Sequence, residues 1–276
     1  MLQPLAAAFA TDSYTLSSGA TLDIDEHGVC RDVYNGHASG ASIMVPTKTA
    51  AEWSTGSYAF LNALPPGVAA GACAPPTLAF TDADKNGNNS AFYSYNNMNI
   101  GTASSDRHVV VIFQMQSNTA GAVASAMTIG GITATKLVSS INVETETSFW
   151  IANVPTGTTA NIVTSLSATA VRSGLHVYTL KDLQSATPYA TSTSTAALPQ
   201  DLSVSVPAGS AVIAGTYADS CPGFTWTGLT EDNDQAMETS RRGGAASGTY
   251  TASGSQSISV NGTSCLLPTS ALAIWK

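Results

Sequence analysis

From Thr77 to Lys276 the chain alternates short runs of β-branched, aromatic and small residues with turn sequences, and this regular spacing constrains the fold more than any other feature. Turn signals such as SSDR, SNTAG, PTGTT, PAGS, SGSQ and NGTS separate the runs, and almost no helical periodicity is visible. About ten short strands in this pattern predict an antiparallel, jelly-roll-like β-sandwich. The expected strand segments are 90–101, 108–117, 126–140, 147–154, 161–168, 175–183, 201–209, 210–217, 248–262 and 270–276.

Details of these runs predict where individual strands lie. HVVVIF at 108–113 is continuously apolar, as expected for a central strand covered on both faces, whereas SISV at 257–260 alternates as an outer strand does. The Gly-Gly of segment 126–140 and the Pro-Thr-Gly-Thr of 155–158 mark chain reversals. We expect the last run, ALAIWK, to complete a sheet and to bury core side chains.

The first 76 residues read differently and predict a small N-terminal α+β module. Alternating runs in SYTLSSGATLDIDEHGVCRDVYNG indicate two or three short strands with hairpin turns. Thr49 and Glu52 have the spacing of a capping box, which predicts a short helix that ends before Pro65-Pro66. The small, Pro-terminated segment GVAAGACAPP, residues 67–76, predicts the boundary between this module and the sandwich of residues 77–276.

Charge argues against two classes of partner. Only 10% of the residues are charged, against roughly 25% in typical soluble proteins, and the formal net charge is −8. A chain without a basic field is poorly suited to nucleic acid or to anionic membranes, and no run of about 18 apolar residues predicts membrane insertion. The N-terminal MLQPLAAAFATDSY has no basic residue, so we expect mature protein there rather than a signal peptide.

The four cysteines, Cys30, Cys73, Cys221 and Cys265, form no CxxC motif, which disfavours zinc and thioredoxin-like chemistry. Two interpretations stay open. They are four separate buried thiols, or they form one disulfide in each region, Cys30–Cys73 and Cys221–Cys265, after release into an oxidising medium.

The runs DRHVVVIF, MTIGGITATKLV, WIANVPTGTTANIVTSLS, FTWTGLTEDNDQ and LAIWK resemble the Ser/Thr/Ala-rich β-sandwich module of virion proteins. This module occurs in tailed bacteriophages and in gene transfer agents of alphaproteobacteria, and the resemblance covers about residues 77–276. Residues 28–73 are similar to a small module at the N-termini of phage structural proteins.

The resemblance implies a tail fibre, head spike or minor tail protein that is not an enzyme. It implies that residues 1–76 bind other virion proteins, that the chain is a homo-oligomer with a trimer favoured, and that it assembles in the bacterial host cytoplasm into an extracellular particle. Contact with a host surface glycan fits this role. No functional residue carries over.

Two polar segments are candidate binding sites. The stretch 225–244 is predicted to be a long loop, and it contains Trp226, Glu231, Asp232 and Asp234. Such a set of groups suits a sugar ring, because the apolar face of a sugar stacks on an aromatic ring while its hydroxyls bind acidic side chains. An ordinary loop with internally paired charges is the alternative.

The second segment contains Asp82, Asp84 and Asn86, which have the D-x-D-x-N spacing of the first half of a calcium-binding loop. Tyr93 stands where such a loop has a bidentate Glu. An exposed turn is therefore the competing interpretation, and no cofactor is expected.

Two other classes of function remain as alternatives to a virion protein. One is a secreted carbohydrate-binding module. The other is a capsule-degrading depolymerase or esterase, which requires a carboxylate pair or triad in a cleft; no G-x-S-x-G elbow is present, and the acids cluster in expected loops.

Overall fold

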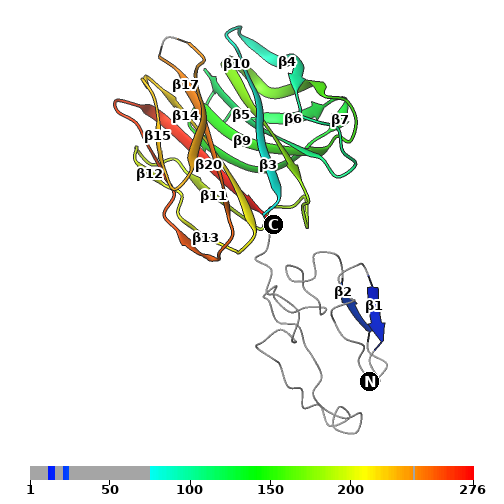
Figure 1. The fold of residues 1–276 in the computed structure, drawn as a ribbon. Helices are drawn as coiled ribbons and strands as arrows, with labels where there is room; N and C mark the ends of the chain where they lie inside the picture. The colour runs from blue at the N-terminus through cyan, green and yellow to red at the C-terminus, as the bar shows by residue number, and fades with distance from the viewer. Residues whose placement is uncertain (1–11, 16–20, 25–74, 239) are drawn as a thin grey trace. The chain divides into compact units, whose positions relative to one another are not determined.

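The computed structural model describes residues 12–15, 21–24, 75–238 and 240–276 (Figure 1). The chain divides into two compact units, Met1–Ala74 and Pro75–Lys276. In the first unit, β1 (Asp12–Thr15) and β2 (Thr21–Ile24) pair as an antiparallel hairpin. The remaining expectations for the N-terminal module, including its helix and Cys30 and Cys73, lie outside the described residues.

The second unit, called the body below, is built only from antiparallel strands, and its described residues contain no helix. Its largest sheet has eight strands in the order β7-β6-β10-β5-β9-β8, with β3 and β4 both paired to β10. These strands are β3 (Thr77–Asn86), β4 (Ser90–Asn99), β5 (His108–Ser117), β6 (Ala124–Ile129), β7 (Ile132–Thr133), β8 (Thr135–Asn142), β9 (Thr145–Asn153) and β10 (Thr159–Lys181).

Strand β10 makes this sheet curl into a nearly closed, barrel-like form. Its first half lies between β4 and β6, and its second half lies between β3 and β5. The enclosed core combines side chains from both halves of the sheet, among them Tyr95, Met127, Trp150, Ile162 and Leu175.

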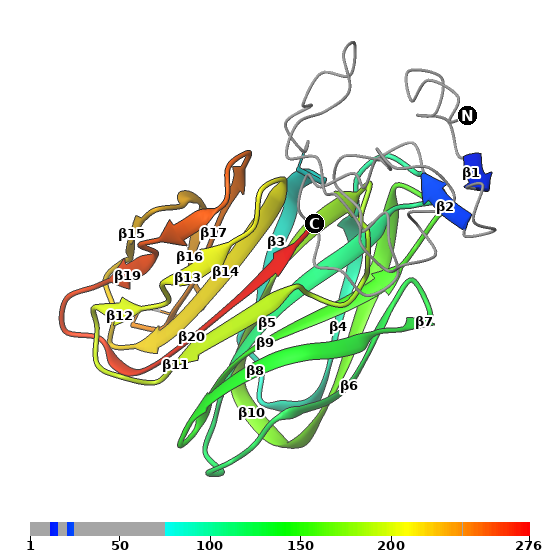
Figure 2. The same ribbon diagram turned by 90° about the horizontal axis from the view of Figure 1, so that it is seen from below.

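A five-stranded sheet in the order β11-β20-β14-β17-β16 packs on the outside of this curled sheet. Two small sheets, β12-β19-β15 and β13-β18, in turn cover its far face. Figure 2 shows these layers side by side, from β12, β15 and β19 to β6 and β7. The strands are β11 (Ala190–Ser194), β12 (Gln200–Asp201), β13 (Val204–Val206), β14 (Ser210–Asp219), β15 (Thr225–Thr227), β16 (Thr230–Ala236), β17 (Arg242–Tyr250), β18 (Gly254–Gln256), β19 (Ser259–Asn261) and β20 (Leu266–Trp275).

The expected central strand is confirmed in β5. Val109, Val111 and Phe113 face the core inside the curled sheet, whereas Val110 and Ile112 face the core shared with the five-stranded sheet. All five side chains are fully buried. A strand covered on both faces has no position for a polar residue that needs water, which explains the unbroken apolar run.

The two glycines of segment 126–140 reverse the chain as expected. Gly130 and Gly131 both have positive φ, 60° and 79°, and Ile129 pairs with Ile132 across the turn. Two consecutive residues with positive φ are what a tight hairpin turn requires, and glycine reaches this region without strain.

Two expectations about strands are wrong. Segments 161–168 and 175–183 belong to one strand, β10, because its first part pairs with β6 and its second part pairs with β5. Gly174 lies within this strand, and a Cβ there would lie 2.4 Å from Cε of Met237. The stretch 225–244 is not a long loop, since it contains β15, β16 and the start of β17. The body is therefore antiparallel all-β as predicted, but it has several sheets instead of two.

Candidate functional site at the far end of the body

Strand β3 defines two ends of the body. Thr77 pairs with Lys181 at the end where the chain enters through Pro75, which we call the near end. Asn86 pairs with Ser173 at the opposite end, the far end. A ten-residue strand spans about 30 Å, so side chains at the far end lie well away from the point of entry.

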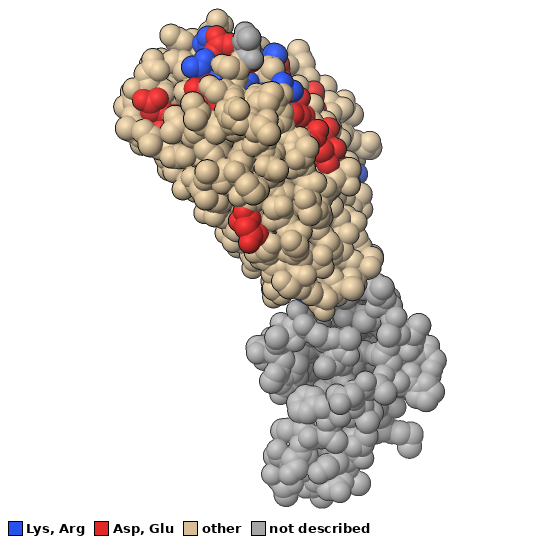
Figure 3. Space-filling view, turned by 90° about the vertical axis from the view of Figure 1, so that its left-hand side faces the viewer, with Lys and Arg blue, Asp and Glu red and all other residues tan. Residues whose placement is uncertain are grey.

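Charged side chains gather at the far end, at the top of the body in Figure 3. Glu238, on the connection between β16 and β17, accepts hydrogen bonds from Arg172 of β10 and from Arg241. Arg241 also lies 3.8 Å, Nε to Oδ1, from Asp219 at the end of β14. We call Arg172, Asp219, Glu238 and Arg241 the charged cluster.

The cluster joins elements from both large sheets. Hydrogen bonding to the Arg172 guanidinium lowers the pKa of the Glu238 carboxyl, and Arg241 adds to this effect. The same contact raises the pKa of Arg172. These ion pairs are partly exposed and screened by solvent, so each contributes little to stability. Their main effect is to hold the β16–β17 connection against β10.

The structure does not bring the predicted glycan contacts together at one point. The Tyr178 hydroxyl donates to Asp232 at 2.8 Å, and Arg242 Nε lies 2.7 Å from Asp234 Oδ1. Glu231 is an exposed residue, but neighbouring protein atoms partly desolvate its carboxyl, and this desolvation, together with the nearby Asp234 carboxylate, raises the pKa of Glu231. A register shift between Glu231 and Asn233 separates these acids.

Trp226 lies on β15 and is half-buried against the cores on the outside of the five-stranded sheet. Its indole Nε1 is buried and has no hydrogen-bond partner. The ring is therefore mainly a packing group, and only part of it is available to a ligand.

A shallow open hollow of about 520 Å³ lies between residues 228–230 and residues 247–250, that is, between the start of β16 and the end of β17. Tyr250 lies in its wall, and its hydroxyl donates to the carbonyl oxygen of Gly228 at 2.5 Å. The lining combines one aromatic ring with hydroxyls and backbone groups, a chemistry that suits neutral hydroxylated ligands. Sequence reasoning missed Tyr250, whose only signal was an aromatic residue in the run GTYTASG. The lining residues are Gly228, Leu229, Thr230, Ser247, Gly248, Thr249 and Tyr250.

Asp82, Asp84 and Asn86, the residues with the spacing of half a calcium loop, lie in a strand and not in a loop or turn. Asp82 and Asp84 lie within β3, where successive alternate residues are spaced about 7 Å apart and do not converge on an ion. Asp82 instead accepts hydrogen bonds from the backbone N–H groups of Ala83 and Asn99. Within the part of the chain that the structure describes, no three His, Cys, Asp or Glu side chains group as metal ligands.

Cys221 and Cys265 form a disulfide, with a Cα–Cα distance of 4.3 Å. It joins the segment after β14 to the segment before β20, beside the pair Asp219–Leu266 at the far end. The two connections are thereby held together covalently next to the charged cluster.

The comparisons add no relative to this description, because no protein family model and no curated protein sequence matches the chain. The described residues contain no helix that is long and apolar enough to span a membrane. The described residues define an antiparallel all-β fold with several sheets, one of them nearly closed.

Proposed function

We propose that this protein is a structural component of a phage or phage-like particle, of the tail fibre, head spike or minor tail type, and that it is not an enzyme. Residues 1–76 attach to other virion proteins, and the body, a variant of the jelly-roll-like module, projects from that attachment as part of a homo-oligomer, with a trimer favoured. Its location is the extracellular particle, after assembly in the bacterial host cytoplasm.

The two ends of the body support this role best. The chain enters at the near end, while the disulfide and the charged cluster lie about one strand length away at the far end. A projecting element needs an attachment at one end and a stiff, cross-linked surface at the other. Layers of buried apolar side chains between the ends resist local opening, which suits a protein exposed outside the cell.

Immunogold labelling of purified particles, with antibodies raised against residues 75–276, tests the proposal. We expect gold on intact particles and the chain in their protein profile. Particles that lack the chain, from a host that demonstrably expresses it, would reject a virion role. The mass of the native protein in solution tests the trimer separately.

The hollow beside Tyr250 supports a second property, contact with a neutral host glycan. Thr249 is exposed on its wall, and Thr249→Lys fills it with a long charged side chain. We expect labelled protein to bind encapsulated cells and this variant to bind at least ten-fold less. The matched control, Ser205→Lys, places the same charge on an exposed position of β13 and leaves binding unchanged.

A secreted carbohydrate-binding module shares this glycan-binding property, but it would be free in the medium and absent from particles. A depolymerase would release reducing ends from capsule during the same incubation. Equal binding by the wild-type chain and by Thr249→Lys would reject the hollow as the contact.

A further inference from the structure

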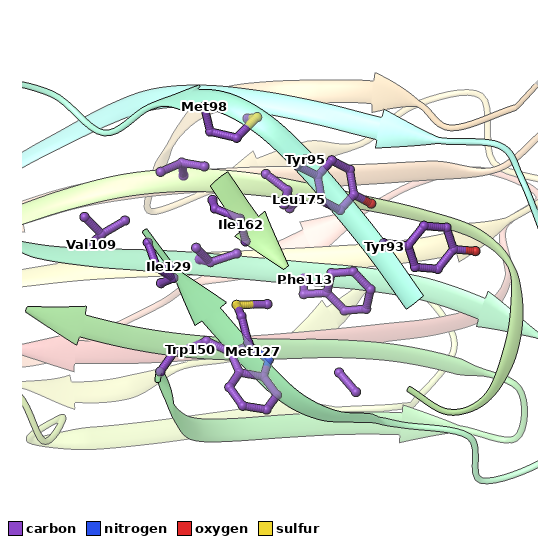
Figure 4. Packing of buried hydrophobic residues seen from close by; sticks show 14 of the residues in the cluster. Tyr93, Tyr95, Met98, Val109, Phe113, Met127, Ile129, Trp150, Ile162 and Leu175 are labelled. Carbon is purple, nitrogen blue, oxygen red and sulfur yellow. The ribbon is translucent and has the colours of Figure 1, made fainter. Parts of the chain in front are cut away.

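The curled sheet has an outer face formed by β4, by residues 159–166 of β10, and by β6 and β7. Figure 4 shows Tyr93, Tyr95 and Met98 of β4 directed into the core together with Ile162 of β10 and Met127 of β6. The intervening side chains of these strands therefore point away from the core and are exposed or half-buried. We call this surface the neutral face; its outward residues are Phe92, Ser94, Asn96, Asn97, Asn99, Ser125, Ala126, Thr128, Ile132, Thr133, Asn161, Val163 and Ser165.

None of the residues in these four strand segments carries a charge. Phe92 is 55% exposed and Ile132 is 40% exposed, and both belong to the small set of large hydrophobic side chains that are exposed in the described residues. Depletion of charge, with apolar side chains set among amides and hydroxyls, is the composition of a protein–protein interface rather than of an ordinary solvated surface.

The edge of this sheet adds a second observation. Among the described residues β4 pairs only with β10, so one side of a ten-residue strand has no strand partner. Exposed edges are usually protected by lysine or proline, which prevent pairing with another chain. The sequence of β4, SAFYSYNNMN, contains neither. A bulge at Asn96 and Asn97 interrupts the edge in its second half, so the regular part of the edge is the half that carries Phe92 and Ser94.

The charge of the chain indicates the partner. With a net charge of −8, two copies repel each other through most orientations. The residues of the neutral face carry no charge to repel their own copy and none to attract a charged partner; the Asp82 carboxylate, which accepts a hydrogen bond from the Asn99 N–H, lies at its border. The strand segments of the neutral face are ten, eight, six and two residues long. With strands about 4.8 Å apart and a rise of about 3.3 Å per residue they cover about 400 Å². Two such faces together give about 800 Å², the size of a weak, reversible interface.

We propose that copies of this chain associate through the neutral face, with Phe92 and Ser94 of β4 at the contact. This inference deepens the oligomer part of the proposed function, and its structural basis is the surface of the body alone. A face that packs against the same face of a second copy is two-fold symmetric, so this contact joins the chains in pairs. The favoured trimer would need a different surface.

Sedimentation velocity of the full chain, at concentrations from about 1 to about 100 μM, tests the proposal. We expect wild-type species heavier than the 28.1 kDa monomer. Ser94→Lys places a like charge on both copies, and Phe92→Asn removes the exposed ring; each weakens association at least ten-fold. The matched controls are Ser205→Lys on β13 and Tyr189→Asn, which removes another exposed aromatic ring. Unchanged near- and far-UV circular dichroism shows that each variant is folded.

A wild-type chain that stays monomeric over this range overturns the proposal, as does Ser94→Lys that associates as tightly as Ser205→Lys. A monomer whose binding to capsule polysaccharide is lost in Ser94→Lys also overturns it and identifies the neutral face as a glycan surface. The two proposals can fail separately. If Ser94→Lys weakens association but immunogold labelling finds no chain on particles, the association through the neutral face stands and the virion role is rejected. If particles are labelled but the purified chain stays monomeric in sedimentation, the virion role stands and the association through the neutral face is rejected.

Discussion

His176 of β10 is fully buried against Asn233 of β16, and its Nε2 lies 3.1 Å from the Asn233 carboxamide oxygen. The imidazole donates this hydrogen bond as the neutral tautomer, and its Nδ1 has no partner. Burial lowers the pKa of His176 to about 4, because the hydrogen bond to Asn233 only partly replaces the water that would stabilise the charged ring. The contact joins the curled sheet to the edge strand of the five-stranded sheet.

This histidine makes the body less stable at mildly acidic pH. The unfolded imidazole binds a proton near pH 6.5, whereas the folded one does so only near pH 4, so the free energy of unfolding falls as the pH drops between these values. The decrease in the free energy of unfolding that is attributable to His176 approaches about 3 kcal/mol near pH 4. His176→Gln retains a donor for Asn233 and does not titrate, so we expect a flatter dependence of stability on pH.

Urea unfolding of both proteins between about pH 7 and about pH 4.5 measures this difference. Carboxylates whose pKa is lowered in the folded protein, such as Glu238, lose their contribution to the free energy of unfolding only at a more acidic pH than His176 does, and they do so in both proteins. Parallel curves for the wild type and His176→Gln would show that His176 is not responsible.

The disulfide stabilises the body by restricting the unfolded chain. Cys221 and Cys265 are 44 residues apart, and a loop of this length corresponds to about 4 kcal/mol in the chain-entropy description. We expect the Cys221→Ser, Cys265→Ser double variant to melt at least 5 °C or so below the wild type. Reducing agent lowers the melting temperature of the wild type more than that of the double variant, which keeps Cys30 and Cys73, and an equal effect on the two proteins would contradict this assignment.

Gly215 of β14 allows two sheets to approach closely. A Cβ at this position would lie 2.6 Å from Cγ2 of Ile112 on β5. Gly215→Ala therefore costs about 1–3 kcal/mol of stability through overpacking. Gly87→Ala is the matched control, because its nearest neighbour would be Cδ of Arg172 at 4.0 Å. Denaturant midpoints compare the two, and equal midpoints would be inconsistent with the close approach.

Glu146 is fully buried and depends on its neighbours for every hydrogen bond. Lys136 Nζ lies 2.6 Å from its Oε1, and Ser139 and the backbone N–H of Ala124 also donate to it. Lys136→Met leaves the carboxylate without its cation, and we expect a loss of about 2–3 kcal/mol, below the value for a fully buried pair because Lys136 is partly exposed.

Lys85→Met is the control for this change, since Lys85 is exposed and donates only to the carbonyl oxygen of Ala236. It should change the free energy of unfolding by less than about 0.5 kcal/mol. Equal effects of the two substitutions in urea unfolding would argue against a structural role for the Lys136–Glu146 pair.

Local sequence determined the features that depend on near neighbours. The unbroken apolar run of Val109–Phe113 predicted a strand buried on both faces, and Gly130 and Gly131 predicted a reversal. Both follow from the period of a strand and from the conformational freedom of glycine, which need no knowledge of distant residues.

Tertiary structure alone decided the rest. The polar run TEDNDQA reads as a loop, yet it becomes β16 because β17 offers a free edge and because Asn233 and Asp232 find His176 and Tyr178, more than 50 residues earlier in the chain. The same contacts direct the carboxylates into separate hydrogen bonds, so they do not form the single site that their spacing suggested. A polar side chain is placed by the partner that satisfies it, and that partner comes from another strand brought near only by the fold.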